Sequence, residues 1–184
     1  MKKSLFCVLS VAAVIGTALT STAASAAVTA NAPTGGDPNT TMTFTVTVGA
    51  LTLTAPASAD LGSGAPGTTI TDALGATTVT DNRALLTAAW TVTASSTAFT
   101  TGGGTGNETI PASDASYDPG EITTTGTITT TGTDITLSGT PAPVVVGSAG
   151  VGNNTATWDP TIAVNVPPQA VGGIYTATLT QSVS

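Results

Sequence analysis

One stretch decides the fold of this sequence: Met42-Thr-Phe44-Thr-Val46-Thr-Val48-Gly49-Ala50-Leu51-Thr-Leu53-Thr-Ala55. Apolar residues alternate with threonine, on even positions from 42 to 48 and on odd positions from 51 to 55. A period of two is typical of a strand with one buried face. The change of parity turns every later side chain to the opposite face. It therefore predicts a bulge or sharp bend at Gly49-Ala50, within one long strand that changes sheets there.

The remainder of the sequence carries the same signature in shorter pieces. Threonine, a β-branched residue that favours strands, accounts for 42 of the 184 residues. No window holds a convincing apolar period of 3.6 residues. Clusters of Gly, Pro, Asn and Asp separate further predicted strands, at 68–71, 77–81, 88–95, 97–101, 121–131, 134–138, 142–147, 155–158, 161–166 and 174–183. We therefore expect an all-β fold, a single antiparallel β-sandwich of about ten strands over residues 41–184.

Residues 122–133 repeat Ile-Thr-Thr-Thr-Gly-Thr twice. Because six is even, Ile122 and Ile128 would lie on the same face of one strand. Two copies do not define a solenoid, which needs at least three stacked units. We expect an extended, threonine-rich strand with its turn.

The N-terminus has the three parts of a signal peptide. Lys2 and Lys3 form a basic start, residues 5–19 are almost unbroken apolar sequence, and Ala24-Ser25-Ala26 has the small-x-small form of a cleavage site. The apolar part is shorter than the roughly 20 residues of a membrane span. We therefore expect a signal peptide at 1–26, a flexible leader at 27–40, and a secreted chain with no stable membrane insertion after cleavage.

Charge and composition narrow the function of the exported chain. Without residues 1–26, the chain has ten acidic residues and a single cation, Arg83, which gives a formal charge of −9. No His, Lys or Cys remains. Nucleic acid and anionic lipid are poor partners, because phosphate binding needs clustered Lys and Arg. Disulfides and lysine isopeptide bonds are excluded, as are histidine-dependent catalysis and histidine-ligated zinc or haem.

The acidic residues give no sign of a catalytic or metal site. Asp114, Asp118 and Glu121 flank a Pro-Gly turn and offer oxygen ligands for calcium, but their spacing differs from the EF-hand loop. We expect solvated loop charges there, with a weak calcium site as the alternative. A carboxylate pair would also need an aromatic-lined cleft to cleave glycans, and aromatic residues are scarce. We expect no enzyme activity, no catalytic residue, no metal and no cofactor.

The two tryptophans are the most informative side chains. Trp90 shares its parity with Ala88, Val92 and Ala94. Trp158 is in phase with Ile162 beyond the interruption at Pro160. Two interpretations remain open at this point. The rings either anchor a core otherwise made of small residues, or form a surface on which a glycan or a partner protein stacks.

One region resembles a known family. Val79-Thr80-Asp81-Asn82-Arg83, followed by Ala89-Trp90-Thr91-Val92 and ending at Phe99, is similar to the first half of the WxL domain of Gram-positive surface proteins. The resemblance is best over residues 79–99 and implies a β-rich module held non-covalently on the peptidoglycan-bearing surface. It marks Trp90, Val92 and Trp158 as candidates for binding the wall or a partner. Val92 replaces the family's Leu, and Trp158-Asp159-Pro160 lacks the aliphatic residue of the second motif.

The Asp81 and Arg83 pair belongs to the turn of that motif. We expect Arg83 to pair with Asp81 across the turn or with another acidic residue, in an exposed contact worth about 0–1 kcal/mol. Ligand binding by Arg83 is the alternative.

The sequence supports two hypotheses about function. The first is a secreted, non-enzymatic cell-surface protein bound non-covalently to peptidoglycan or another cell-wall polymer, with other surface proteins as further partners. The second is a structural subunit of a surface filament or coat that assembles by β-strand addition.

Overall fold

The computed structural model describes residues 40–184 of the chain. Two units are distinguished, Met1–Thr45 and Val46–Ser184, and all described strands lie in the second. The predicted signal peptide at 1–26 lies outside the described residues, as does the predicted leader up to residue 39.

The described chain is all-β and antiparallel, as predicted. It forms eleven strands and two single-turn 3₁₀ helices, against the ten or so strands expected. The elements are β1 (Leu51–Thr54), β2 (Thr69–Ala73), β3 (Thr77–Ser96), β4 (Phe99–Thr100), η1 (Gly106–Glu108), β5 (Thr109–Ile110), η2 (Ala112–Asp114), β6 (Ala115–Asp118), β7 (Ile122–Gly132), β8 (Ile135–Thr136), β9 (Ala142–Trp158), β10 (Thr161–Asn165) and β11 (Leu179–Val183).

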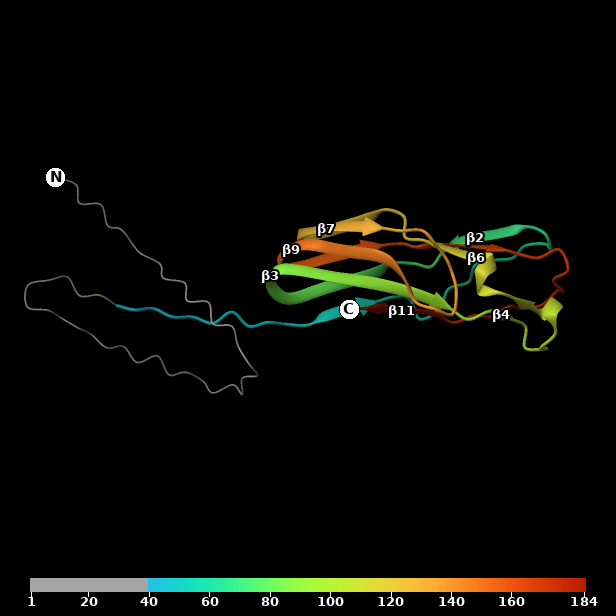
Figure 1. Cartoon of the computed structure of the whole chain (residues 1–184), viewed down its shortest axis with the longest axis horizontal. Helices are drawn as coiled ribbons and strands as arrows, with labels where there is room; N and C mark the ends of the chain where they lie inside the picture. The colour runs from blue at the N-terminus through green and yellow to red at the C-terminus, as the bar shows by residue number, and fades with distance from the viewer. Residues whose placement is uncertain (1–39) are drawn as a thin grey trace, which may run out of the picture. The chain divides into compact units, whose positions relative to one another are not determined.

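A five-stranded sheet is built around the two longest strands, β3 and β9, which lie side by side with β7 in Figure 1. Its order is β1-β3-β9-β7, and β11 also pairs with β3. The register of β3 and β9 runs from Thr77 opposite Trp158 to Ala94 opposite Ala142. Because β9 occupies one edge of β3 throughout, β1 and β11 share the other edge, one at each end of β3.

The second sheet has four strands in the order β2-β10-β6-β8, and β4 and β5 form a small separate pair. Alternate residues of both large sheets point into one shared core, as the period-two pattern requires. The larger buried residues of this core are Val79, Trp90, Val92, Ile110, Tyr117, Leu137, Val144, Val145, Trp158, Ile162 and Val164. Two antiparallel sheets that share a core make a β-sandwich.

The prediction of one long strand over 41–55 is half wrong. The predicted bulge at Gly49-Ala50 is confirmed, because the Gly49 N–H donates to the Asn82 carbonyl while the Asn82 N–H donates to Ala50, so two residues face one. A Cβ at Gly49 would lie 2.7 Å from the Asn82 Cβ, so this approach requires glycine. Beyond the bulge, however, residues 40–50 belong to no strand, and the expected change of sheets does not occur.

The other errors concern strand boundaries. The predicted strands at 77–81 and 88–95 are one strand, β3, and those at 142–147 and 155–158 are one strand, β9. Register shifts between β3 and β9 accommodate the residues between them, and Ala84 and Ala149 adopt positive φ angles of 52° and 53°. Strands β5 and β6 were not predicted, because each has four residues or fewer and too few alternations to form a pattern.

Candidate functional site

The structure places the three predicted binding residues in the core. Trp90 and Trp158 are each 2% exposed, and Val92 is 0% exposed. Of the two interpretations of Trp90, the core one is correct, because Ala88 and Ala94, which share its parity, are buried as well. A wall polymer could reach these rings only if the sandwich opened, so they present no stacking surface in this structure.

The position of Trp90 depends on Gly147, which faces it across the β3–β9 ladder. A Cβ at residue 147 would collide with the Trp90 indole ring, so the glycine makes room for the tryptophan. The indole Nε1 is 3.5 Å from the Asn154 Oδ1, at the long limit of a hydrogen bond. Packing against the β9 backbone, rather than polar contact, therefore holds this ring in place.

Trp158 begins a buried chain of hydrogen bonds that links the two sheets. Its indole N–H donates to the Tyr117 hydroxyl at 2.9 Å, and that hydroxyl donates to the Gln181 Oε1 at 3.1 Å. The three residues come from β9, β6 and β11. Burial raises the pKa of Tyr117 to about 12, although the Trp158 hydrogen bond acts in the opposite direction.

This raised pKa predicts an alkaline limit to stability. The ordinary tyrosine pKa is 10.0 and the folded value is about 12, so the stabilisation is complete below pH 10 and is lost as the pH rises through the folded pKa. We expect the free energy of unfolding to fall by about 1.4 kcal/mol per pH unit in this window. Urea titrations at several pH values measure it, and Tyr117→Phe should abolish the dependence. An unchanged slope in that variant would contradict the assignment to Tyr117.

The predicted ion pair between Asp81 and Arg83 is present. Arg83 Nη2 lies 2.8 Å from Asp81 Oδ2 and Nε lies 2.9 Å from Oδ1, a bidentate arrangement. The expectation of an exposed pair is wrong, because the Asp81 side chain is 0% exposed and that of Arg83 only 28%. The Arg83 hydrogen bond holds the pKa of the Asp81 carboxyl below its usual value. Asp81 follows Val79 on the inward face of β3, just before the first register shift against β9, and this position explains its burial.

The acidic residues of the alternative calcium site, Asp114, Asp118 and Glu121, do not form one site in the structure. Asp118 accepts a hydrogen bond from the Gly120 N–H at 2.7 Å and so closes the Pro-Gly turn. Its negative charge raises the pKa of nearby Asp134. Within residues 40–184, no three acidic, histidine or cysteine side chains come together as a metal cluster. Asp114, in contrast, lines a pocket.

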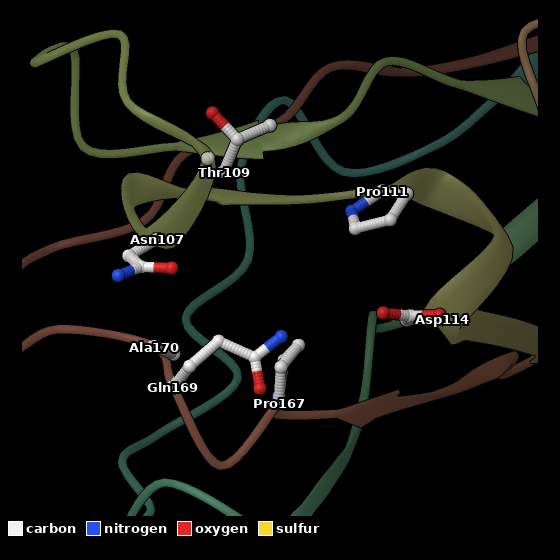
Figure 2. A pocket seen from close by; sticks show the side chains of 8 residues that line it. Asn107, Thr109, Pro111, Asp114, Pro167, Gln169 and Ala170 are labelled. Carbon is white, nitrogen blue, oxygen red and sulfur yellow. The ribbon is translucent and has the colours of Figure 1, made fainter.

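This pocket, of about 330 Å³, lies between the loop around η1 and the turn that follows β10. Figure 2 shows the side chains of Asn107, Gln169 and Asp114 placed around one space, with Pro111 and Pro167 at its sides. Its lining residues are Gly106, Asn107, Thr109, Pro111, Asp114, Pro167, Gln169 and Ala170. Two amides, a hydroxyl and a carboxylate form its polar part, and none of the lining residues carries a positive charge.

Backbone contacts fix the two walls of the pocket to each other. The Val171 N–H donates to the Asn107 carbonyl at 3.1 Å, and the Tyr175 hydroxyl lies 2.9 Å from the same oxygen. On the other side, Glu108 accepts hydrogen bonds from the Thr105 N–H and hydroxyl, which lower its pKa. The Asn107 and Gln169 side chains are therefore carried by loops with defined positions.

This pocket is not predicted from the sequence. Its residues come from two segments about 60 positions apart, and neither segment has a period that marks it. The available signals were Pro167-Pro168, which cannot continue a strand, and the run of turn residues from Gly102 to Asn107. The second of these predicts only a turn between strands.

The comparisons with known proteins give no family. No family model, no curated protein and no solved structure matches the chain. Among the described residues, none of the helices has the length and apolar character needed to cross a membrane.

Proposed function

We propose that this chain is a secreted, non-enzymatic cell-surface protein that binds peptidoglycan or another cell-wall polymer non-covalently. Two features of the sequence support this proposal, namely the signal peptide pattern at 1–26 and the resemblance of residues 79–99 to the WxL domain. Because both tryptophans are buried, the polymer must contact other residues. The pocket beside η1 is the observation that carries the proposal, as the place where a wall glycan binds.

The chemistry of the pocket suits sugars. Amides and hydroxyls both donate and accept hydrogen bonds, so Asn107, Gln169 and Thr109 match the hydroxyl and acetamido groups of a wall glycan. The rings of Pro111 and Pro167 offer apolar contact for the C–H face of a sugar. Asp114 adds an acceptor, and the absence of a cation in the lining disfavours phosphate. A volume of about 330 Å³ lies near the lower end of ligand pockets, so it accommodates a short piece of polymer.

Co-sedimentation with purified sacculi tests the proposal. The wild-type chain should sediment with the sacculi. Replacing both Asn107 and Gln169 by alanine should weaken this binding by about 10-fold or more, because each lost hydrogen bond is worth roughly 0.5–1.5 kcal/mol. Asn153→Ala removes an equally exposed amide from β9 and should bind as the wild type does.

Two results would count against this function. A wild-type chain that stays in solution would remove wall binding itself. A double variant that sediments as well as Asn153→Ala would remove the pocket as its location.

A further inference from the structure

The strongest unexplained surface is the apolar segment, residues 42–48. Its four large side chains are exposed, Met42 and Phe44 by 88% and Val46 and Val48 by 69%. Soluble proteins rarely expose several neighbouring large apolar side chains without a binding purpose. None of residues 40–50 belongs to a strand, although the segment leads directly into β1.

The sequence of the apolar segment is that of a strand with one buried face. Its apolar residues stand at every second position, so an extended backbone would carry all four on one side and the threonines on the other. An unpaired strand also leaves its N–H and C=O groups without partners. Addition to a sheet edge would satisfy the backbone and cover the apolar face together.

The edge of β3 next to β1 is a poor acceptor. Between Asp81 and Trp90 the register of β3 against β9 shifts three times, and Ala84 has a positive φ of 52°. The Arg83 guanidinium donates to the Ala89 carbonyl at 2.9 Å, which occupies an acceptor on this stretch. Beyond the bulge at Gly49-Ala50, this edge of β3 is therefore too irregular for the apolar segment to pair with it as a strand.

The free edge of β7 is a better acceptor. β7 is the last strand of its sheet and pairs only with β9 among the described strands. Edge strands are usually protected by charged residues or proline, yet residues 122–132 contain neither. The register of β7 against β9 shifts between Thr125 and Thr127, around Gly126 with its φ of +76°, and again between Thr127 and Thr129. Residues 129–132 then form a regular edge. Four residues are also the length over which β1 pairs with β3, so this part of the edge is long enough for a short added strand.

We propose that the apolar segment of one copy adds as a strand to the β7 edge of a second copy. Neither partner carries a charge, so the contact adds no repulsion between chains that are strongly acidic elsewhere. The added apolar side chains would lie beside Ile128, which is only partly buried. Because donor and acceptor are different parts of the chain, the contact is head-to-tail and continues from copy to copy. This inference does not depend on wall binding.

A complementation experiment on the purified exported chain tests the proposal. Phe44→Asp places a charge on the apolar face and removes the donor, while Thr129→Lys with Thr131→Lys places charges on β7 and removes the acceptor. By light scattering after size exclusion, the wild type should form species larger than a dimer, and each variant alone should be monomeric. Mixing the two variants should give a one-to-one dimer and nothing larger, since one intact donor meets one intact acceptor.

Matched controls separate this outcome from misfolding. Phe44→Leu keeps an apolar side chain on the same face of the apolar segment and should assemble as the wild type does. The substituted threonines of β7 are exposed, and near-ultraviolet circular dichroism of the buried tryptophans reports whether each variant is folded. A wild type that stays monomeric at several hundred micromolar, or folded variants that do not dimerise on mixing, would overturn the proposal.

Discussion

Trp158→Ala should lower the free energy of unfolding by about 3–5 kcal/mol, the usual cost of truncating a large aromatic side chain in a core. The ring is 2% exposed and lies where β9 faces Thr77 on β3 and Ile122 on β7. Its loss also leaves the buried Tyr117 hydroxyl without its donor. Since whole domains are stable by only about 5–15 kcal/mol, this one change removes a large share. Urea denaturation followed by far-ultraviolet circular dichroism measures the loss.

Trp158→Phe is the matched control for this prediction. It keeps an aromatic ring in the core but removes the indole N–H, so we expect about 1–2 kcal/mol, the cost of a small cavity and one unsatisfied hydroxyl. The two variants distinguish a core residue from a binding residue. If Trp158→Ala kept its stability yet lost sedimentation with sacculi, the ring would be a binding surface and the core assignment would fail.

The fold was largely readable because alternation reports burial directly. Ala88, Trp90, Val92 and Ala94 were assigned to one face from their parity, and all four are buried. The irregularity at Gly49-Ala50 was readable for the same reason, since the change of parity predicts a bulge or sharp bend there. Alternation does not report pairing, however. The apolar segment alternates as clearly as β1 does, but a strand also needs an edge, and the edge is set by residues far along the chain.

The candidate site was much less predictable. The pocket beside η1 depends on the contact between Asn107 and Val171, 64 residues apart. It also depends on the Tyr175 hydroxyl, which lies within hydrogen-bond distance of the carbonyl oxygens of both residues. No local pattern encodes such contacts. The Asp81–Arg83 pair illustrates a subtler limit. Its existence followed from spacing, but its burial followed from the inward position of Asp81 on β3, a position where apolar residues were expected.

The burial of this pair changes how a wall-binding function should be sought. The residues that carry the WxL-like pattern, Asp81, Arg83, Trp90 and Val92, are all bound into the interior or its margin. Their spacing is therefore explained by the packing of β3 against β9. A spacing that packing explains gives information about the fold and not about a ligand. The ligand has to be sought at the exposed pocket and at the apolar segment.

Arg83→Met tests that structural assignment with the second large effect. The methionine keeps an apolar stem but leaves the buried Asp81 carboxylate without its bidentate partner. We expect a loss of about 3 kcal/mol at neutral pH, near the lower end for a broken buried pair because the guanidinium is partly exposed. Asp60→Asn, which alters an exposed acid that accepts only the Gly62 N–H, should change stability by less than about 0.5 kcal/mol.

The pH dependence of the Arg83→Met loss identifies its cause. In the wild type, Arg83 holds the pKa of Asp81 below the ordinary 3.8, so this stabilisation is present above about pH 4 and is lost as the pH falls through the folded-state pKa. In the variant nothing of this strength opposes protonation, and a neutral carboxyl is far cheaper to bury than a charged one. The difference between variant and wild type should therefore shrink in acid, as urea titrations at pH 7 and at about pH 3 would measure. A difference that stays equal at both pH values would assign the loss to the packing of the Arg83 stem and not to its charge.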